Sequence, residues 1–320
     1  MGIGNWESED KLITQVASYA IARASGWYMG SVSIIKSPPG TKTEGKMLNE
    51  IITVYAITDD LLKAIGHYED ARREMSDAEI MTTALIAAMF FSGNQSEACN
   101  YMKDHNLIPK MLEKSRFNRR LHGISMLMND LFHQIGMILK ESSNCTEDLL
   151  DSFPVAMCDN IRIFNIKLIT SADYRGYIAS KKRYFYGVRV QLLTTKSGIP
   201  VEFIFLPGNA NDVRALNALP LNLFPGSEVY GDSAYTDYTA EDDLFETSQI
   251  ALKVMRKKNS KRQDEPWNQY VKQSTRHYVE TVFSAITSLF PKSIHAVTYE
   301  GFLLKLEAFI FAFTLKQAFL

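Results

Sequence analysis

The sequence has few of the features that mark a secreted protein. Its 320 residues include only three cysteines, Cys99, Cys145 and Cys158, and no two of them form a Cys-x-x-Cys pair. An odd number of cysteines without a regular framework favours a reducing compartment and argues against a disulfide-stabilised scaffold. The first ten residues are acidic and lack the basic start of a secretory signal. We therefore expect a cytoplasmic protein.

The chain also lacks an excess of either charge and a long uninterrupted apolar run. Lysine and arginine total 35 against 36 acidic residues, a formal net charge of -1, so any nucleic-acid binding must come from local patches. The apolar run at 80–93 is too short to span a bilayer. The run at 301–320 contains Lys305, Glu307 and Lys316, which favours a core or interface helix and predicts no membrane association.

The composition that remains is typical of a soluble globular protein, with 46% hydrophobic and 22% charged residues. The length allows one large domain or two ordinary ones. Residues 1–46 contain a Pro-Pro-Gly turn and are interpreted as an extension or linker. We expect an all-helical domain over 47–142 and an α/β domain with C-terminal helices over 143–320.

The helical region carries one clear start signal and one basic segment. Ser76 and Glu79 form a capping-box pattern before an apolar run, which predicts a helix. Further on, apolar residues recur at helical spacing: Phe117, Leu121, Ile124, Leu127 and Leu131. Because a helix with one buried stripe leaves its other side exposed, we expect three neighbouring arginines to point outward, namely Arg116, Arg119 and Arg120. They form either a solvated face or a DNA-contacting surface.

The second half changes to a mixture of strand and helix signals. Alternating apolar residues predict a hairpin over 183–208, with its turn at Thr-Thr-Lys-Ser-Gly. A helix over 211–219, capped by Asn211 or Asp212, follows it. The remaining signals predict a strand, a helix, a strand and a long helix, at 227–232, 238–246, 250–255 and 267–290. This order is typical of a mixed α/β layer fold.

Three acidic residues occupy comparable positions in that fold. Asp151 lies where the first strand is expected, Asp232 ends the strand at 227–232, and Glu280 lies inside the long helix. All three can converge at one edge of the sheet. Carboxylates so arranged suit a pair of Mg²⁺ ions, which prefer hard oxygen ligands, and Mn²⁺ could substitute. The alternative is that each is an ordinary surface acid.

These residues carry a family resemblance. From about residue 48 to 300 the chain resembles bacterial insertion-sequence transposases with a DDE catalytic domain of ribonuclease-H-like fold, and most of all the insertion sequence 982 family. The matching stretches are SDAEIMTTALI, SRFNRRLH, DSFPVAMCDNIRI, KRYFYGVRVQLLTTKSGIPVEFIFLPGNANDVRAL, GDSAY and RHYVETVFS. The resemblance implies a metal-binding catalytic triad of Asp151, Asp232 and Glu280. Asp159 is the alternative to Asp151 as the first acid of the triad. Because Asp159 follows Pro154, it is less suited to end the same strand, and we favour Asp151.

The same resemblance assigns an auxiliary residue. Related transposases often carry Tyr-x2-Arg-x3-Glu-x6-Lys around the glutamate, and Arg276 matches the arginine of that pattern. Gln273 and Thr287 occupy the tyrosine and lysine positions. Arg276 lies one helical turn before Glu280, so it either contacts the same DNA strand or forms an ion pair with Glu280.

Two further basic segments are candidates for DNA contact. Six residues within 253–262 are interpreted as backbone contacts, with a solvated face as the alternative: Lys253, Arg256, Lys257, Lys258, Lys261 and Arg262. The segment 181–186 mixes basic residues with aromatics. There we favour Tyr184 and Tyr186 as core residues of the hairpin over base-stacking platforms.

The resemblance implies a transposase that cuts at the terminal inverted repeats of its element and joins the 3′-OH ends to target DNA. Its partners would be double-stranded element ends and target DNA, bound by a homodimer or higher oligomer associated with the nucleoid. Two alternatives stay open. One is a nuclease of the same fold that joins nothing, and the other is an inactive DNA-binding protein adopted by its host.

Overall fold

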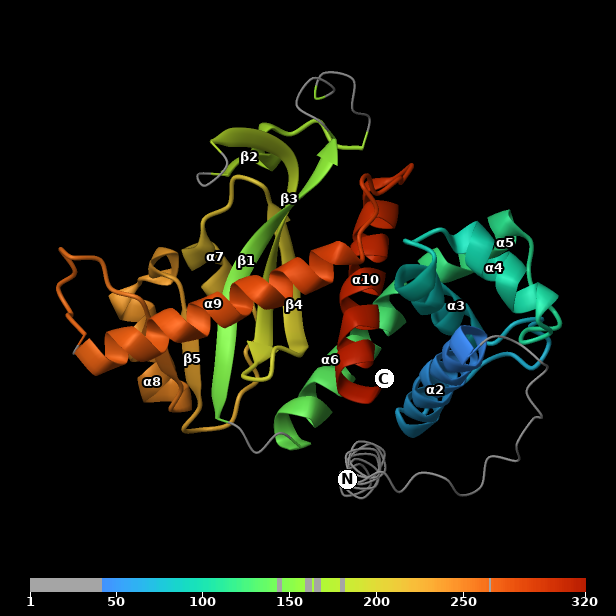
Figure 1. Ribbon diagram of the computed structural model, residues 1–320, viewed down its shortest axis with the longest axis horizontal. Coiled ribbons are helices and arrows are strands. Elements are labelled where there is room, and N and C mark those ends of the chain that lie inside the picture. The colour runs from blue at the N-terminus through green and yellow to red at the C-terminus, as the bar shows by residue number, and fades with distance from the viewer. Residues whose placement is uncertain (1–41, 143–145, 159–162, 164–167, 179–181, 265) are drawn as a thin grey trace. The chain divides into compact units, whose positions relative to one another are not determined.

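The computed structural model describes residues 42–142, 146–158, 163, 168–178, 182–264 and 266–320, without the side chains of 42–44 and 275–277 (Figure 1). The described residues form two compact units, one of residues 42–138 with Glu307–Leu320 and the other within Leu139–Leu306. The end of the chain thus groups with the helical unit and not with the α/β unit. Cys145, Asp159 and nearly all of the predicted linker lie outside the described residues. Within the described part, no helix is long and apolar enough to span a bilayer.

The first unit is helical, as predicted. Its described elements are α2 (Lys42–Ala64), α3 (Asp77–Phe90), α4 (Gln95–Asp104), α5 (Lys114–Gly123), most of α6 (Ser125–Ser142) and most of α10 (Tyr299–Phe319). Because α2 begins at Lys42, the last residues of the predicted linker are helical. The capping box is confirmed: the Ser76 side chain accepts from the backbone N–H of Glu79, whose carboxylate accepts from the N–H of Ser76. The helix α3 that follows is buried along most of its length.

The apolar stripe after residue 114 is divided between two helices. Phe117 and Leu121 are buried, as predicted. The helix α5 ends at Gly123, however, so the predicted run does not continue on one face, and Ile124 and Leu127 are only half-buried. Glycine is a poor helix former because it loses the most backbone freedom on folding, which accounts for a break at this position.

The C-terminal helix α10 is a core helix, as its apolar sequence predicts. Its side chains from Phe309 to Phe313 are buried in the helical unit. Glu307 enters this core with them. Burial raises the pKa of its carboxyl group to about 8. A hydrogen bond from Asn129 lowers the pKa but does not outweigh burial. Glu307 is therefore a neutral acid at pH 7, which explains how an acidic residue fits into an apolar helix face.

The α/β unit is built on one mixed sheet. Its strands are β1 (Glu147–Cys158), β2 (Arg175–Ile178), β3 (Arg183–Thr195), β4 (Pro200–Pro207), β5 (Glu228–Gly231) and β6 (Ala251–Val254). They are ordered β2-β3-β1-β5-β6, and β4 also pairs with β3. The strands β1, β2 and β4 pair with β3 in antiparallel orientation. The strands β1, β5 and β6 are parallel to one another. The predicted hairpin β3–β4 and the strands β5 and β6 are confirmed, and the short strand β2 was not predicted.

Three helices cover this sheet: α7 (Asp212–Ala218), α8 (Tyr238–Ser248) and α9 (Pro266–Ser288). Figure 1 shows α9 running across one face, where it packs against β1 and β5. Phe153 of β1 and Phe283 of α9 mark this contact, with ring centroids 5.0 Å apart. Because successive side chains of a strand point to opposite faces, Asp151 shares the α9 face with Phe153.

One ion pair is buried inside the α/β unit. The Nζ of Lys140 lies 2.6 Å from Oε1 of Glu202 in β4 and also donates to the backbone carbonyl of Leu221 at 3.0 Å. The two side chains are only 3% and 0% exposed. Because the ammonium has two acceptors in the interior, the pair ties the end of α6 to the sheet.

Candidate active site

Asp151 and Asp232 are neighbours across two parallel strands. The pairing of β1 with β5 ends at Leu150 opposite Gly231, and each aspartate is the next residue in its strand direction. Asp232 therefore directly follows β5, as predicted. Asp151 does not end its strand: β1 continues to Cys158, and Asp151 pairs with Leu192 of β3 on its other side. The two carboxylates thus meet where β5 stops and β1 continues alone.

Pro154 explains why the end of β1 was misjudged. A proline cannot donate a backbone hydrogen bond, and we interpreted it as a point beyond which the strand would not continue. In the structure Pro154 pairs with Arg189 of β3 on one side of β1. On the other side, the pairing of β1 with β5 has already ended at Leu150. The missing N–H therefore interrupts no pairing with β5.

The two aspartates share a small pocket with the closing helix. A cavity of ≈ 20 Å³ is lined by Asp151 and Asp232, by residues of β1 and β5, and by Lys272 and Val279 of α9. Glu280 is the next residue after Val279, but it is exposed and is not among the lining residues. The structure thus brings the two aspartates together and places Glu280 on the helix that covers them. The side chain of Arg276 lies outside the described residues.

Lys272 was not predicted as part of this site. Its side chain is buried, and its Nζ lies 2.6 Å from Asp264 and 2.9 Å from the backbone carbonyl of Val254, the last residue of β6. These bonds fix the N-terminal half of α9 against the end of β6. A signal was available in the sequence, because Lys272 precedes Glu280 by eight residues, about two turns of the same predicted helix.

A buried hydrogen-bond network lies on the opposite side of β1. Oδ1 of Asp212 in α7 accepts from the Ser152 hydroxyl and from the Gln191 amide, each at 2.9 Å. The Tyr235 hydroxyl donates to the same Gln191 side chain at 2.5 Å. Tyr235 and Gln191 are fully buried. Burial, followed by the charges of Asp212 and Asp151, raises the pKa of Tyr235 well above its ordinary value, so its hydroxyl remains a donor.

This network adjoins both aspartates. Ser152 follows Asp151 in β1, and Tyr235 closes the short 3-10 helix Ser233–Tyr235 that begins after Asp232. Asp212 was predicted only as one of two possible helix caps. The structure assigns the cap to Asn211, whose side chain accepts from the N–H of Arg214 at 2.9 Å, and this leaves Asp212 for the network.

The basic segment 253–262 is only partly available for DNA. Arg256 forms a double hydrogen bond to Glu241, at 2.6 and 2.7 Å, with both side chains at most 10% exposed. Arg262 bonds to Asp242 and Lys253 to Glu228. Three exposed cations have no ion-pair partner within the described parts of the chain, Lys257, Lys258 and Lys261. The other three, interpreted from sequence as DNA contacts, are held in the fold.

The arginines of α5 divide in a similar way. A pocket of ≈ 300 Å³ is lined by Leu112, Glu74 and five arginines, Arg72, Arg73, Arg116, Arg119 and Arg120. Arg120 does not point outward as predicted, because its guanidinium lies 2.5 Å from the buried Asp77. Arg116 is exposed and pairs with Glu74 at 3.0 Å. Arg119 is exposed and has no ion-pair partner among the residues described.

Asp77 also belongs to a group of residue types that can bind metals. Suitable atoms of His67, Glu69 and Asp77 lie within 4.8 Å of one another. Burial alone would raise the pKa of Asp77, but hydrogen bonds from Arg120 and His67 and the charge of Arg73 outweigh it and hold the pKa below its ordinary value. Because two guanidinium groups already neutralise this carboxylate, the group is better explained as an anchor between α3 and α5 than as a metal site.

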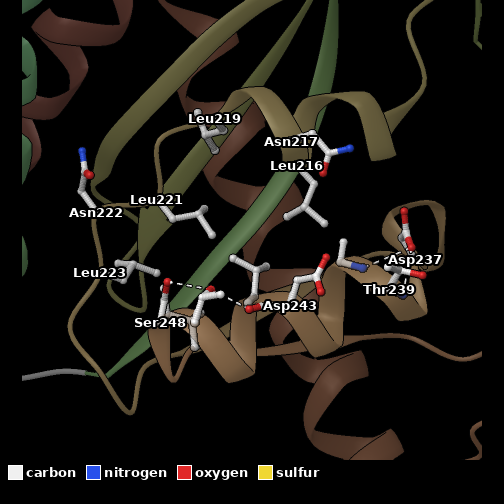
Figure 2. A pocket seen from close by; sticks show the side chains of 14 residues that line it. Leu216, Asn217, Leu219, Leu221, Asn222, Leu223, Asp237, Thr239, Asp243 and Ser248 are labelled. Carbon is white, nitrogen blue, oxygen red and sulfur yellow. Dashed lines mark hydrogen bonds between the residues drawn. The ribbon is translucent and has the colours of Figure 1, made fainter.

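The larger pocket of the α/β unit lies away from the two aspartates. Figure 2 shows this cavity of ≈ 670 Å³ between α7, the segment after it and α8. Its lining includes leucines such as Leu216 and Leu221 and two acids, Asp237 and Asp243. No lysine or arginine lines it. Acidic side chains repel phosphate, so this cavity does not fit a DNA backbone.

One of three comparisons with known proteins finds a match for this chain. A search of curated proteins and a search of solved structures find no match for the chain. A family model does match, over residues 142–294, which covers the sheet, the two aspartates and α9. That model describes a transposase DDE domain, and this part of the chain is similar to it.

Proposed function

We propose that this protein cuts DNA at the terminal inverted repeats of an insertion sequence and joins the resulting 3′ ends to target DNA. The observation that carries the proposal is the adjacency of Asp151 and Asp232 at the edge of two parallel strands, within the segment that matches a transposase DDE domain. We assign Glu280 of α9 as the third carboxylate and Arg276 as an auxiliary DNA contact. The sheet order, with an antiparallel hairpin beside three parallel strands, supports a ribonuclease-H-like fold.

The site fits divalent metal ions, and Mg²⁺ is the proposed cofactor. Two carboxylates line one cavity, and carboxylate oxygens are the ligands that Mg²⁺ prefers. The enclosed part of the site, a cavity of ≈ 20 Å³, has room for a water-sized ligand, and Glu280 does not line it. Asp151, Asp232 and Glu280 would hold two ions, which when bound supply charge stabilisation for in-line displacement at phosphorus. Mn²⁺ offers the same preference for oxygen ligands.

Two displacements would use this one site. Water attacks the phosphodiester at the element end and the P–O3′ bond breaks, which leaves a 3′-OH on the element. That 3′-OH then attacks a target phosphodiester, whose own 3′ oxygen leaves. The chain's residues supply position: Ser152 and Tyr235 brace the segments that carry the aspartates, and Lys272 fixes α9.

The exposed lysines after β6 are the proposed DNA-backbone contacts of the α/β unit. Replacing Lys257, Lys258 and Lys261 together with alanine is expected to weaken binding about equally for element ends and for random DNA. The slope of log Kd against log salt should decrease by up to about 0.9 for each phosphate that a lysine no longer neutralises. The measurement is a salt titration of fluorescence anisotropy. Lys292→Ala, a single exposed lysine elsewhere in the unit, is the control, and an unchanged slope in the triple variant would identify a solvated face.

Arg116 and Arg119 are the remaining candidates in the helical unit for recognition of element ends. Arg120 is unsuited to this role because its guanidinium is bound to Asp77. A dimer or higher oligomer is part of the proposal, because two ends of one element have to be joined in a single event.

The test of the proposed function is a joining assay. Linear DNA carrying the inverted repeats that flank this reading frame is incubated with the protein, supercoiled target DNA and Mg²⁺. We expect nicks at the repeat ends and covalent joint molecules, both abolished by a chelator and restored by added Mg²⁺. Nicks without joint molecules would instead support a nuclease of the same fold. If the intact protein binds the ends but forms neither nicks nor joint molecules, the result would support the inactive DNA-binding alternative.

A further inference from the structure

The edge hairpin β2–β3 exposes two tyrosines that no packing explains. Tyr177 and Tyr184 are directly opposite each other in the antiparallel pairing, with ring centroids 4.9 Å apart. Their side chains are 47% and 50% exposed. On the other face of the same hairpin, Gly176 and Phe185 are buried, and a side chain at Gly176 would collide with the Gly208 carbonyl. One face of the hairpin is therefore part of the core and the other is open.

The two exposed rings differ from their neighbour Tyr186. That residue is 3% exposed, and its hydroxyl donates to the backbone carbonyls of Ile169 and Ser171. Tyr186 is thus the core residue that the sequence pattern predicted, whereas Tyr184 is not. Among the described residues, the hydroxyls of Tyr177 and Tyr184 make no hydrogen bond. Their rings contribute little to the fold and are accessible to a ligand.

The surroundings of these rings are positively charged. The guanidinium of Arg175 lies over the Tyr184 ring, 4.8 Å from its centroid. Lys182 and Arg183 are exposed at the start of β3, and in the described part of the chain none of these three cations forms an ion pair. Asp173 is the one acid in the described segments from 168 to 184. Aromatic faces next to unpaired cations are the combination that binds single-stranded nucleic acid, with bases on the rings and phosphates on the cations.

We propose that Tyr177 and Tyr184 form a stacking platform for an unpaired DNA base, with Arg175, Lys182 and Arg183 on the adjacent phosphates. This inference deepens the proposed function and rests on it for the source of the DNA, a strand separated near the cut. A fully paired duplex does not fit, because its bases are already stacked on one another.

The register of the sheet gives the distance from the cut. Asp151 pairs with Leu192 of β3, and Tyr184 is eight residues further along the same strand. At ~3.3 Å per residue the platform lies roughly 26 Å from the aspartates. At the duplex spacing of ~3.4 Å per nucleotide along one strand, this distance corresponds to about eight nucleotides, and to fewer in an extended unpaired strand. The platform would therefore receive a base up to about eight positions from the scissile phosphate.

The experiment compares DNAs that differ only in unpaired bases. A blunt duplex is compared with the same duplex extended by a ten-nucleotide single-stranded overhang that carries 2-aminopurine. For the wild-type protein we expect tighter binding of the overhang DNA and quenching of the 2-aminopurine fluorescence. The double variant Y177L/Y184L should bind the overhang DNA about fivefold to 150-fold more weakly, as expected when one base can no longer stack on a ring. Its affinity for the blunt duplex should not change.

Two variants control for structure and surface chemistry. Y177F/Y184F keeps both rings and should bind the overhang DNA like the wild type. Y68L removes a tyrosine that is 86% exposed in the helical unit and should change nothing. If Y177L/Y184L does not fold, the single variants and the wild-type fluorescence carry the test.

Three results would overturn the platform. They are an absence of quenching in the wild type, an equal decrease in affinity for blunt and overhang DNA, and no decrease for either DNA. The outcome is separate from the joining assay. A wild-type protein that forms joint molecules without quenching refutes the platform alone, and quenching without cleavage refutes the proposed function alone.

Discussion

Replacing Asp232 with asparagine is expected to abolish cleavage and joining while DNA binding persists. The amide keeps the shape of the carboxylate but removes the negative charge that would bind a divalent cation. Several kcal/mol of transition-state stabilisation depend on that cation, and each 1.36 kcal/mol is tenfold in rate, so we expect the rate to fall by roughly a thousandfold or more. The measurement is the rate of nicking at element ends, with binding followed in parallel by anisotropy.

The matched control is Asp243→Asn in α8. Asp243 is an acid of the same unit, exposed where Asp232 is half-buried, and it lines the larger pocket, away from the strand edge. Its replacement should leave the nicking rate within a factor of two or so, as for a surface substitution. Nicking by Asp232→Asn at the wild-type rate would remove this residue from the mechanism and leave the adjacency of the two aspartates without a catalytic role.

Breaking the buried pair of Lys140 and Glu202 is expected to have the largest effect on stability. Glu202→Gln removes the charge that faces the ammonium of Lys140 at 2.6 Å in the interior, and removing one partner of such a pair costs about 3–5 kcal/mol. The free energy of unfolding, measured by urea denaturation, should decrease by this amount. The double variant K140M/E202L removes both charges and should recover most of the decrease.

A result in which Glu202→Gln and the double variant are equally destabilised would contradict this explanation. It would indicate that the loss of stability does not come from an uncompensated buried charge, because the double variant carries no charge at these two positions. DNA binding provides a second check, because neither residue lies at the proposed DNA surface and the affinity of the folded fraction should not change.

Most of the fold could be predicted because its elements have regular periods and clear ends. The alternation in β3, the turn after Thr195 and the polar start of α7 are local signals, and the structure confirms each element. The strand β2 was missed because its four residues are too few to show a period. The length of β1 was missed because the tolerance of Pro154 depends on where β5 ends, a fact of tertiary structure.

The site was predictable to a lesser degree, and the misses have one cause. Asp232 could be placed because it ends a strand signal, and Asp151 because it lies where the first strand was expected. Charges, however, were counted without their partners, so Arg120 and Arg256 were interpreted as DNA contacts although they bind Asp77 and Glu241. A sequence shows that a cation is present, but whether an acid neutralises it depends on contacts between residues far apart in the chain.

The network around Asp212 gives the site a property that the aspartates alone would lack. Ser152 and Tyr235 are bonded within the folded protein, so the peptide segments that carry Asp151 and Asp232 lose their freedom during folding and not when a substrate arrives. The entropy cost of ordering these two segments therefore falls on folding and does not add to the activation free energy of the reaction. We then expect sequence changes in α7, which does not line the pocket of the two aspartates, to alter the rate constant of the chemical step while leaving the affinity for DNA unchanged.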